Sequence, residues 1–191
     1  MDYSSILKNI DRHIKLDQSE IEFFISTIEY KKIKKKEMIL ELGKVCKETI
    51  FVKTGCLRSY YLTDQDIQIM QFAISDWWIG DLKSFIHQTP SELCVDALQN
   101  SEIFQISKNN LENLYDRIPK FERFFRIQME NALIAHQDRI LQAHTLSSKK
   151  RYESFLKTYP EFHRNIPLKN VANYLGVTPE HLSTIRAHKK K

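Results

Sequence analysis

The sequence predicts an α+β fold in which an antiparallel, jelly-roll-like β-roll precedes a long helix and an all-helical C-terminal segment. Three observations lead to this prediction. Between about residues 36 and 106, short runs rich in β-branched and aromatic residues alternate with turn-forming stretches. After Ser107 the apolar residues recur at helical spacing. Residues 168–188 have the pattern of two short helices joined at a glycine.

Composition excludes several other classes of protein. With 191 residues, 42% of them hydrophobic, the chain is large enough to bury a core. No apolar stretch reaches the roughly 18 residues of a membrane helix, and the N-terminus lacks the pattern of a signal peptide. Cys46, Cys56 and Cys94 form no CxxC pair, and the histidines form no HxxxH or HExxH arrangement. We therefore expect a cytoplasmic protein without a membrane segment, a bound metal or another cofactor.

The first predicted element is an amphipathic helix over residues 17–30, opened by Asp17 and Glu20 at the spacing of a capping box. Six strand-like runs follow, at residues 38–42, 49–53, 56–62, 67–74, 92–98 and 102–106. No helical pattern separates these runs, which favours an antiparallel roll over a parallel α/β sheet.

A long helix is expected from about Pro119 to Leu146, because Pro119 interrupts the helical pattern that starts at Ser107. It carries two apolar rows, one with Phe125, Met129, Ala132, His136, Ile140 and Ala143 and one with Phe124, Ile127, Ile134 and Leu141. Two rows need two partners, so we expect one to pack on the strands and the other on a second copy of the helix. Complete burial within a monomer is the alternative.

The C-terminal segment predicts a helix-turn-helix. Val171, Ala172 and Leu175 share one face of the first helix, and Gly176 suits a left-handed helix end. Thr178 can cap the second helix, with Pro179 in its first turn. From Ser147 onward there are ten basic residues and three acidic ones, whereas the rest of the chain has a small negative charge. This distribution indicates that the C-terminal quarter contacts a polyanion.

The whole chain from residue 17 onward resembles the Crp/Fnr superfamily of transcription regulators. Residues 50–62 resemble the family's strand–glycine–strand hairpin, with Gly55 at the turn, and residues 78–98 resemble its phosphate-binding cassette. The resemblance implies a cyclic-nucleotide-binding-like β-roll with N-terminal helices over 1–118, a dimerisation helix over 119–146 and a helix-turn-helix DNA-binding domain over 147–191. We expect no complete β-wing after the helix-turn-helix.

The cassette departs from the members that bind cyclic nucleotides. Gly80 and Asp81 stand where the family has Gly-Glu, and Ser91 and Glu92 stand where it has Arg-Ser. A phosphate diester needs a cation at that place. Lys83 is a candidate substitute, and on the long helix His136 and Gln137 correspond to the nucleobase-contacting positions. We expect no cyclic nucleotide to bind; the pocket either takes another effector or is filled by its own side chains.

Other sensor chemistry is also constrained by the residues present. Three cysteines cannot supply the four thiolates that the iron–sulfur members use. A haem ligand among the cysteines and histidines stays open.

The resemblance further implies a homodimer that binds double-stranded DNA and contacts RNA polymerase. The candidate DNA-binding residues surround the second helix of the motif: Thr178, Pro179, Glu180, His181, Ser183, Thr184, Arg186, Lys189 and Lys190. Thr184 stands where the family commonly has Arg. A ligand-binding or protein-interaction β-roll module that has lost specific DNA binding therefore remains an alternative. A cupin-like enzyme is disfavoured, because His87 is the single histidine between residues 36 and 106.

Overall fold

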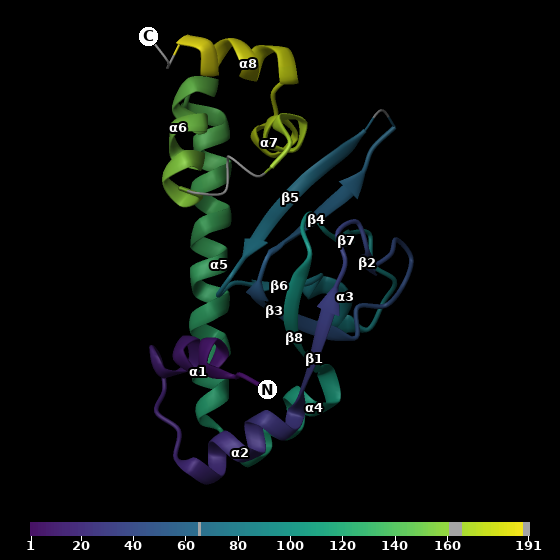
Figure 1. The fold of residues 1–191 in the computed structure, drawn as a ribbon, viewed down its shortest axis with the longest axis vertical. Helices are drawn as coiled ribbons and strands as arrows, with labels where there is room; N and C mark the ends of the chain where they lie inside the picture. The colour runs from purple at the N-terminus through teal and green to yellow at the C-terminus, as the bar shows by residue number, and fades with distance from the viewer. Residues whose placement is uncertain (65, 161–165, 189–191) are drawn as a thin grey trace. The chain divides into compact units, whose positions relative to one another are not determined.

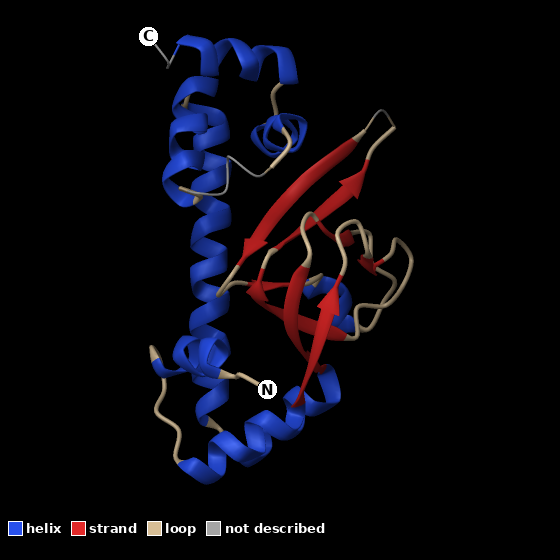
Figure 2. Ribbon diagram, in the orientation of Figure 1, coloured by secondary structure: helices blue, strands red, loops and turns tan. Residues whose placement is uncertain are grey.

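The computed structural model describes residues 1–64, 66–160 and 166–188 of the chain (Figures 1 and 2). Its helices are α1 (Ser4–Asp11), α2 (Gln18–Thr27), α3 (Leu82–His87), α4 (Lys108–Arg117), α5 (Lys120–Thr145), α6 (Ser148–Thr158), α7 (Leu168–Leu175) and α8 (Pro179–His188). Its strands are β1 (Ile28–Ile33), β2 (Met38–Leu40), β3 (Glu48–Thr54), β4 (Cys56–Leu62), β5 (Ile67–Ile74), β6 (Trp78–Ile79), β7 (Cys94–Ala97) and β8 (Ser101–Ser107).

The chain folds into two compact units. The first contains Met1–Leu62 and Met70–Met129, and the second contains Thr63–Ile69 and Glu130–Lys191. The long helix α5 therefore contributes its first residues to one unit and its remainder to the other. The division into three functional domains at residues 118 and 146 stays a prediction.

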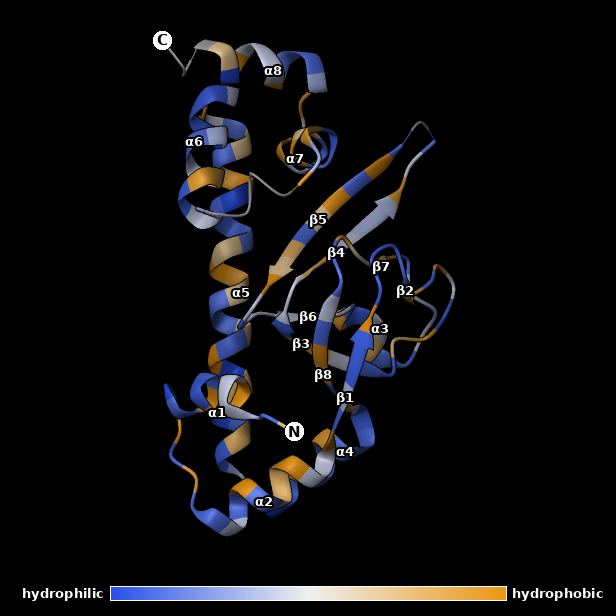
Figure 3. Cartoon of the chain, in the orientation of Figure 1, coloured by the Kyte–Doolittle hydropathy of each residue, from blue (hydrophilic) through white to orange (hydrophobic). Residues whose placement is uncertain are grey.

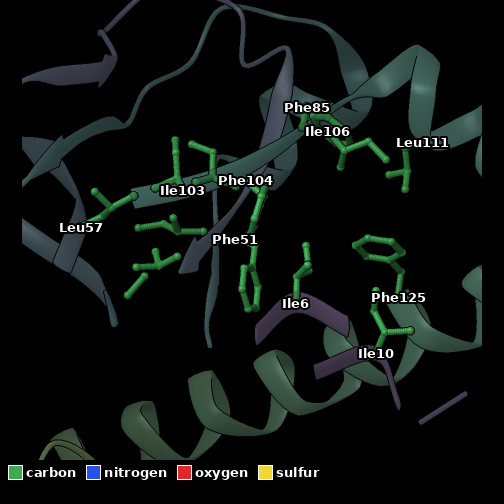
Figure 4. Close-up of a cluster of buried hydrophobic side chains, with 14 of the residues drawn as sticks. Ile6, Ile10, Phe51, Leu57, Phe85, Ile103, Phe104, Ile106, Leu111 and Phe125 are labelled. Carbon is green, nitrogen blue, oxygen red and sulfur yellow. The ribbon is translucent and has the colours of Figure 1, made fainter. Parts of the chain in front are cut away.

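The first unit is built on two four-stranded sheets, ordered β1-β8-β3-β6 and β2-β7-β4-β5. Every described strand pair outside the β4–β5 hairpin is antiparallel, and Phe51 of β3 lies opposite Phe104 of β8. Both phenylalanines are fully buried, in a core that also receives Ile6 and Ile10 from α1 and Phe125 from α5 (Figure 4). These findings confirm the antiparallel roll.

The N-terminal region differs from the prediction. The capping box is present, with the Asp17 side chain accepting from the Glu20 amide and the Glu20 side chain from the Asp17 amide. However, α2 ends at Thr27, and residues 28–30 belong to β1, because Ile28–Ile33 pairs along its whole length with β8. Helix α1 agrees with the expected N-terminal helices, although its bounds were not predicted. Strand β6 and helix α3 were not expected, and α3 shows that a helix does separate two of the strands, β6 and β7.

Gly55 joins β3 to β4 with a backbone that other residues rarely adopt. Its φ is +90°, and a Cβ there would lie 2.6 Å from the Asn100 carbonyl oxygen and 2.8 Å from the Ser101 Cα. The turn therefore brings β4 so close to the residues before β8 that only glycine fits. This explains why the family-like hairpin has a glycine here.

The second unit contains most of α5, the helices α6 to α8 and the tip of the β4–β5 hairpin. The Ser147 hydroxyl accepts from the Lys150 amide and caps the N-terminus of α6. In α6, Tyr152 and Phe155 are buried, and Phe155 contacts Tyr159 and Tyr174 of α7, with ring centroids 4.9 and 5.6 Å away. Among the described residues, no helix is both long and apolar enough to cross a bilayer.

Candidate DNA-binding helices and the cassette of the β-roll

The helix-turn-helix is formed by α7 and α8 with the turn that the sequence predicts. Gly176 has a left-handed backbone with φ of +65°, and its amide bonds to carbonyls in the last turn of α7. The Thr178 hydroxyl accepts a 3.2 Å hydrogen bond from the His181 amide, and Pro179 is the first residue of α8. The local signals in the sequence therefore determine both helix ends.

Small and apolar side chains hold the two helices together. Val171, Ala172 and Leu182 are at most 2% exposed, and Ile185 is half-buried. Ala172 lies at the contact, where its single methyl group allows close approach of the helices. The inward face of α8 is thus occupied by packing, which leaves its other face for a partner.

The candidate DNA-contacting residues lie on that free face or beside it. Thr178, Glu180, His181, Ser183, Thr184 and Arg186 are exposed, and Pro179 is half-buried. The Thr184 hydroxyl donates to the Glu180 carbonyl oxygen at 3.2 Å, so it points along the helix and keeps its oxygen free as an acceptor. Lys189 and Lys190 lie outside the described residues.

Arg151 holds the motif in place, a role that the sequence did not suggest. Its guanidinium donates to the Leu146 carbonyl at 3.1 Å and to the Leu175 carbonyl at 3.2 Å. These carbonyls belong to residues at the ends of α5 and α7, which have no partner within their helices. One side chain of α6 thereby links the end of the long helix to the first helix of the motif.

The tip of the β4–β5 hairpin also contacts α7. The Lys169 ammonium lies 3.0 Å from the Asp66 carboxylate, and the Gln68 amide donates to the Asn173 carbonyl at 2.8 Å. The hydrogen bond from Lys169 is the main reason why the pKa of Asp66 lies below its ordinary value. Both contacts join residues about 100 positions apart in sequence, so no local pattern could have indicated them.

In the cassette, the polar side chains bind to one another. The buried Asp81 carboxylate caps α3 by accepting from the Ser84 amide at 3.2 Å, and it accepts from the Ser91 hydroxyl at 2.6 Å. The Ser91 oxygen in turn accepts from the Leu93 amide at 3.0 Å. Gly80, Asp81 and Ser91 are therefore close together, as the resemblance implies, but Asp81 and Ser91 are already satisfied by each other.

Lys83 and Glu92 lie outside this network. Their charged groups are 3.0 Å apart, and both side chains are 68% exposed. The hydrogen bond that Lys83 donates to Glu92 is the main cause of its raised pKa. Lys83, the candidate substitute for the missing cation, is therefore paired with Glu92 at the surface. His136 and Gln137 are exposed on the part of α5 that belongs to the second unit.

The first unit contains a cavity of about 200 Å³ beside Gly80. Cys46, Glu48 and Lys44 help to line it, but of the candidate effector residues only Gly80 does. Ligand pockets typically measure about 300–1,000 Å³, so this cavity is too small for a nucleotide.

All three cysteines are buried and free. Burial raises the pKa of the Cys46 and Cys56 thiols, which disfavours the thiolate that binds metals and haem iron. No haem site is supported at these two positions.

The long helix α5 carries apolar residues in its middle part, which appear as orange segments in Figure 3. Phe124 and Phe125 are buried, whereas Met129, Leu133, Ile134, Ile140 and Leu141 are 39–60% exposed. Leu133 extends the first predicted row and was missed in the sequence. Burial in a monomer does not account for these residues.

Comparison with known proteins agrees with this geometry. A model of the cyclic nucleotide-binding domain matches residues 30–118. Electron transport regulator A of Shewanella oneidensis is 28% identical over 185 residues, which cover 89% of this chain and 72% of that protein. The fumarate and nitrate reduction regulatory protein of Vibrio cholerae is 27% identical over 187 residues, with the same two coverages. The chain is therefore similar, over most of its length, to transcription regulators of the Crp/Fnr type.

Solved structures of Crp/Fnr type share the fold. FixK2 from Bradyrhizobium japonicum superposes with a TM-score of 0.72 at 18% identity, over 84% of this chain and 83% of that chain. The regulator CLP of Xanthomonas campestris superposes with a TM-score of 0.73 at 15% identity, over 91% of this chain and 92% of that chain. The sequence relatives support a DNA-binding transcription regulator of the Crp/Fnr type.

Proposed function

We propose that this Crp/Fnr regulator acts as a homodimer that binds a two-fold symmetric DNA site through α8. The observation that carries the proposal is the division of α8 into a buried face, with Leu182 fully buried, and an exposed polar face opposite. Recognition helices of this motif enter the major groove with their N-terminal residues against the base edges. The N-terminal turn of α8 contains Glu180, and Ser183 and Thr184 follow on the exposed side.

Glu180 and Thr184 are the residues that we assign to base recognition. The exposed Glu180 carboxylate has the chemistry to accept from the N4 amino group of a cytosine. Thr184 uses its hydroxyl hydrogen within the helix, so it reads a base through its oxygen as an acceptor or through its methyl group against a thymine. Glu180 and Thr184 would together distinguish bases without the Arg that the family commonly has at the position of Thr184.

The basic residues around α8 are assigned to the phosphate backbone. His181 and Arg186 are exposed beside the reading face, and Lys189 and Lys190 follow in sequence. Contacts to phosphate fix position and supply affinity, but they carry little sequence information. Contact with RNA polymerase belongs to the same proposal, without an assigned residue.

Dimerisation is assigned to α5. Met129, Leu133 and Ile140 follow one another at spacings of four and seven along one side of the helix and are at least 39% exposed. Covering such a row with the same row of a second chain gives the two-fold interface that a symmetric DNA site requires. No enzymatic step is proposed for the chain.

The effector is proposed to be something other than a cyclic nucleotide, or to be absent. Two facts support this: the cassette carboxylate Asp81 is bonded to Ser91, and the carboxylate of Glu92, which lies 3.0 Å from the Lys83 ammonium, would repel a cyclic phosphate there.

Capture of genomic fragments tests the proposal. The purified full chain is incubated with sheared genomic DNA and excess non-specific competitor, and bound fragments are sequenced and footprinted. A regulator of this kind enriches discrete fragments and protects two half-sites about 34–36 Å apart. Uniform recovery of all fragments would instead favour an interaction module without specific DNA binding.

A further inference from the structure

We infer that a groove between the end of α1 and the first turn of α5 binds a phosphorylated small molecule. The groove lies within the first compact unit, has a volume of about 370 Å³, and is lined by residues 11–15 together with Lys120 and Arg123. This volume falls in the range of small-molecule sites, about 300–1,000 Å³. The inference goes beyond the proposed function, which assigns nothing to this region.

The lining is strongly cationic. Arg12, Lys15, Lys120 and Arg123 carry permanent positive charges, and Asp11 is the one carboxylate among the lining residues. A concave surface lined by one sign of charge concentrates the field and attracts ions of the opposite sign. Ile14, which is 7% exposed, contributes apolar surface to the same groove.

Two of the basic side chains have no carboxylate partner. In the described part of the chain, Arg123 makes no ion pair, and His13 contacts only the ring of Phe124, at a centroid distance of 6.0 Å. Three further cations are paired: Arg12 with Asp76, Lys15 with Asp11 and Lys120 with Glu20. The Lys15–Asp11 pair is 79% and 60% exposed, so an incoming anion can replace Asp11 at little cost.

Lys120 fixes the two walls of the groove relative to each other. Its ammonium lies 3.2 Å from the Lys15 carbonyl oxygen and 2.8 Å from the Glu20 carboxylate. The loop after α1 is thereby held beside the first turn of α5, so the cationic side chains are brought together before any ligand binds. Preorganisation of this kind lowers the entropic cost of binding.

The chemistry of the groove favours phosphate over a single carboxylate. Arg123 presents a planar fork of donors that matches two phosphate oxygens, and the exposed Lys15 adds a second cation. The groove also offers more cations than one carboxylate can engage. Its only aromatic ring, that of His13, already contacts Phe124, so no exposed face is provided for a nucleobase. We therefore assign the site to the phosphoryl part of the ligand.

Calorimetric titration of the full chain with pyrophosphate, without DNA, tests the inference. Saturable binding of one pyrophosphate per chain is expected, with weaker binding of inorganic phosphate. Arg123→Gln should weaken it about tenfold, the effect of losing one charge-assisted hydrogen bond. Arg126→Gln removes the same charge from the same helix outside the lining and should leave the affinity within about twofold. Lys15→Gln provides a second groove variant.

Three results would overturn the inference. The first is the absence of saturable heat at millimolar pyrophosphate. The second is equal weakening by Arg123→Gln and Arg126→Gln, which would indicate non-specific attraction to net charge. The third is binding of citrate as tight as that of pyrophosphate, which would contradict the phosphoryl assignment. Because the titration contains no DNA, its failure leaves the proposed DNA-binding function untouched.

Discussion

The Ser91 hydroxyl donates a 2.6 Å hydrogen bond to the Asp81 carboxylate, across ten residues of the cassette. Both residues are buried, and each has a second partner within the same loop. The resemblance seen in the sequence implies that this loop is a phosphate-binding cassette. Here its polar groups stabilise one another, so the loop is complete without a ligand.

From this arrangement we predict that neither cyclic AMP nor cyclic GMP binds at micromolar concentration. A ligand would have to break the Ser91–Asp81 bond and approach a buried carboxylate without a compensating cation. Losing a charge-assisted contact and adding a repulsive carboxylate should each cost about 1.5–3 kcal/mol, together a loss of at least ~10²-fold. Calorimetry on the purified chain checks this; micromolar binding would show that Lys83 leaves Glu92 to serve as the cation.

The predicted dimer is tested with Ala132→Glu. Ala132 is exposed on α5 beside the apolar row, so the substitution places two like charges across the two-fold interface. Light scattering should show the wild type at the mass of a dimer and the variant shifted toward a monomer. Asn131→Glu, an exposed change on the side of the helix opposite Met129, Leu133 and Ile140, serves as the control and should leave the dimer intact. A wild type that is monomeric at micromolar concentration would disprove the interface.

Gly55→Ala should destabilise the first unit by more than Gly43→Ala does. Both glycines have positive φ, +90° and +79°, so both substitutions carry a backbone strain of about 1–3 kcal/mol. Only at Gly55 would the new Cβ also collide with the backbone of Asn100 and Ser101, whereas nothing lies within 4 Å at Gly43. Thermal unfolding of both variants measures the difference, and equal losses would mean that the collision relaxes without cost.

The contact between the hairpin tip and α7 should depend on pH. The folded pKa of Asp66 lies below its ordinary value of 3.8, so the stabilisation is present above that value and is lost as the pH falls through the folded pKa. Amide hydrogen exchange in α7 should therefore accelerate below about pH 3.8 more in the wild type than in Asp66→Asn, which lacks the carboxylate. The same pH response in both proteins would mean that the Lys169–Asp66 pair contributes nothing.

Much of the fold could be predicted because its signals are local. Asp17 with Glu20, Ser107, Ser147 and Gly176 all mark helix ends where the structure has them. β1 was missed because Ile28 fits the helical spacing of the residues before it, and pairing with β8 decides its conformation instead. Helix α1 does carry a signal: Ile6 and Ile10 are spaced four apart and are almost fully buried.

The candidate site was predicted less completely than the fold. The outward residues of α8 follow from helical geometry once Leu182 is taken as inward. In contrast, the bonds from Arg151 to the ends of α5 and α7, the Lys169–Asp66 pair and the pairing of Lys83 with Glu92 depend on tertiary packing. No periodicity or spacing in a single sequence encodes such contacts.

Selection of bound duplexes from a random library, carried out in parallel with wild type and Glu180→Ala, tests the reading of DNA by α8 most directly. The wild type should enrich a two-fold symmetric motif. Glu180→Ala should enrich the same motif with preference relaxed at one symmetric base pair, where the best site loses about 1–3 kcal/mol while random DNA is little affected. A wild type that enriches no symmetric motif, or a Glu180→Ala variant that weakens binding to every sequence equally, would contradict base reading by α8.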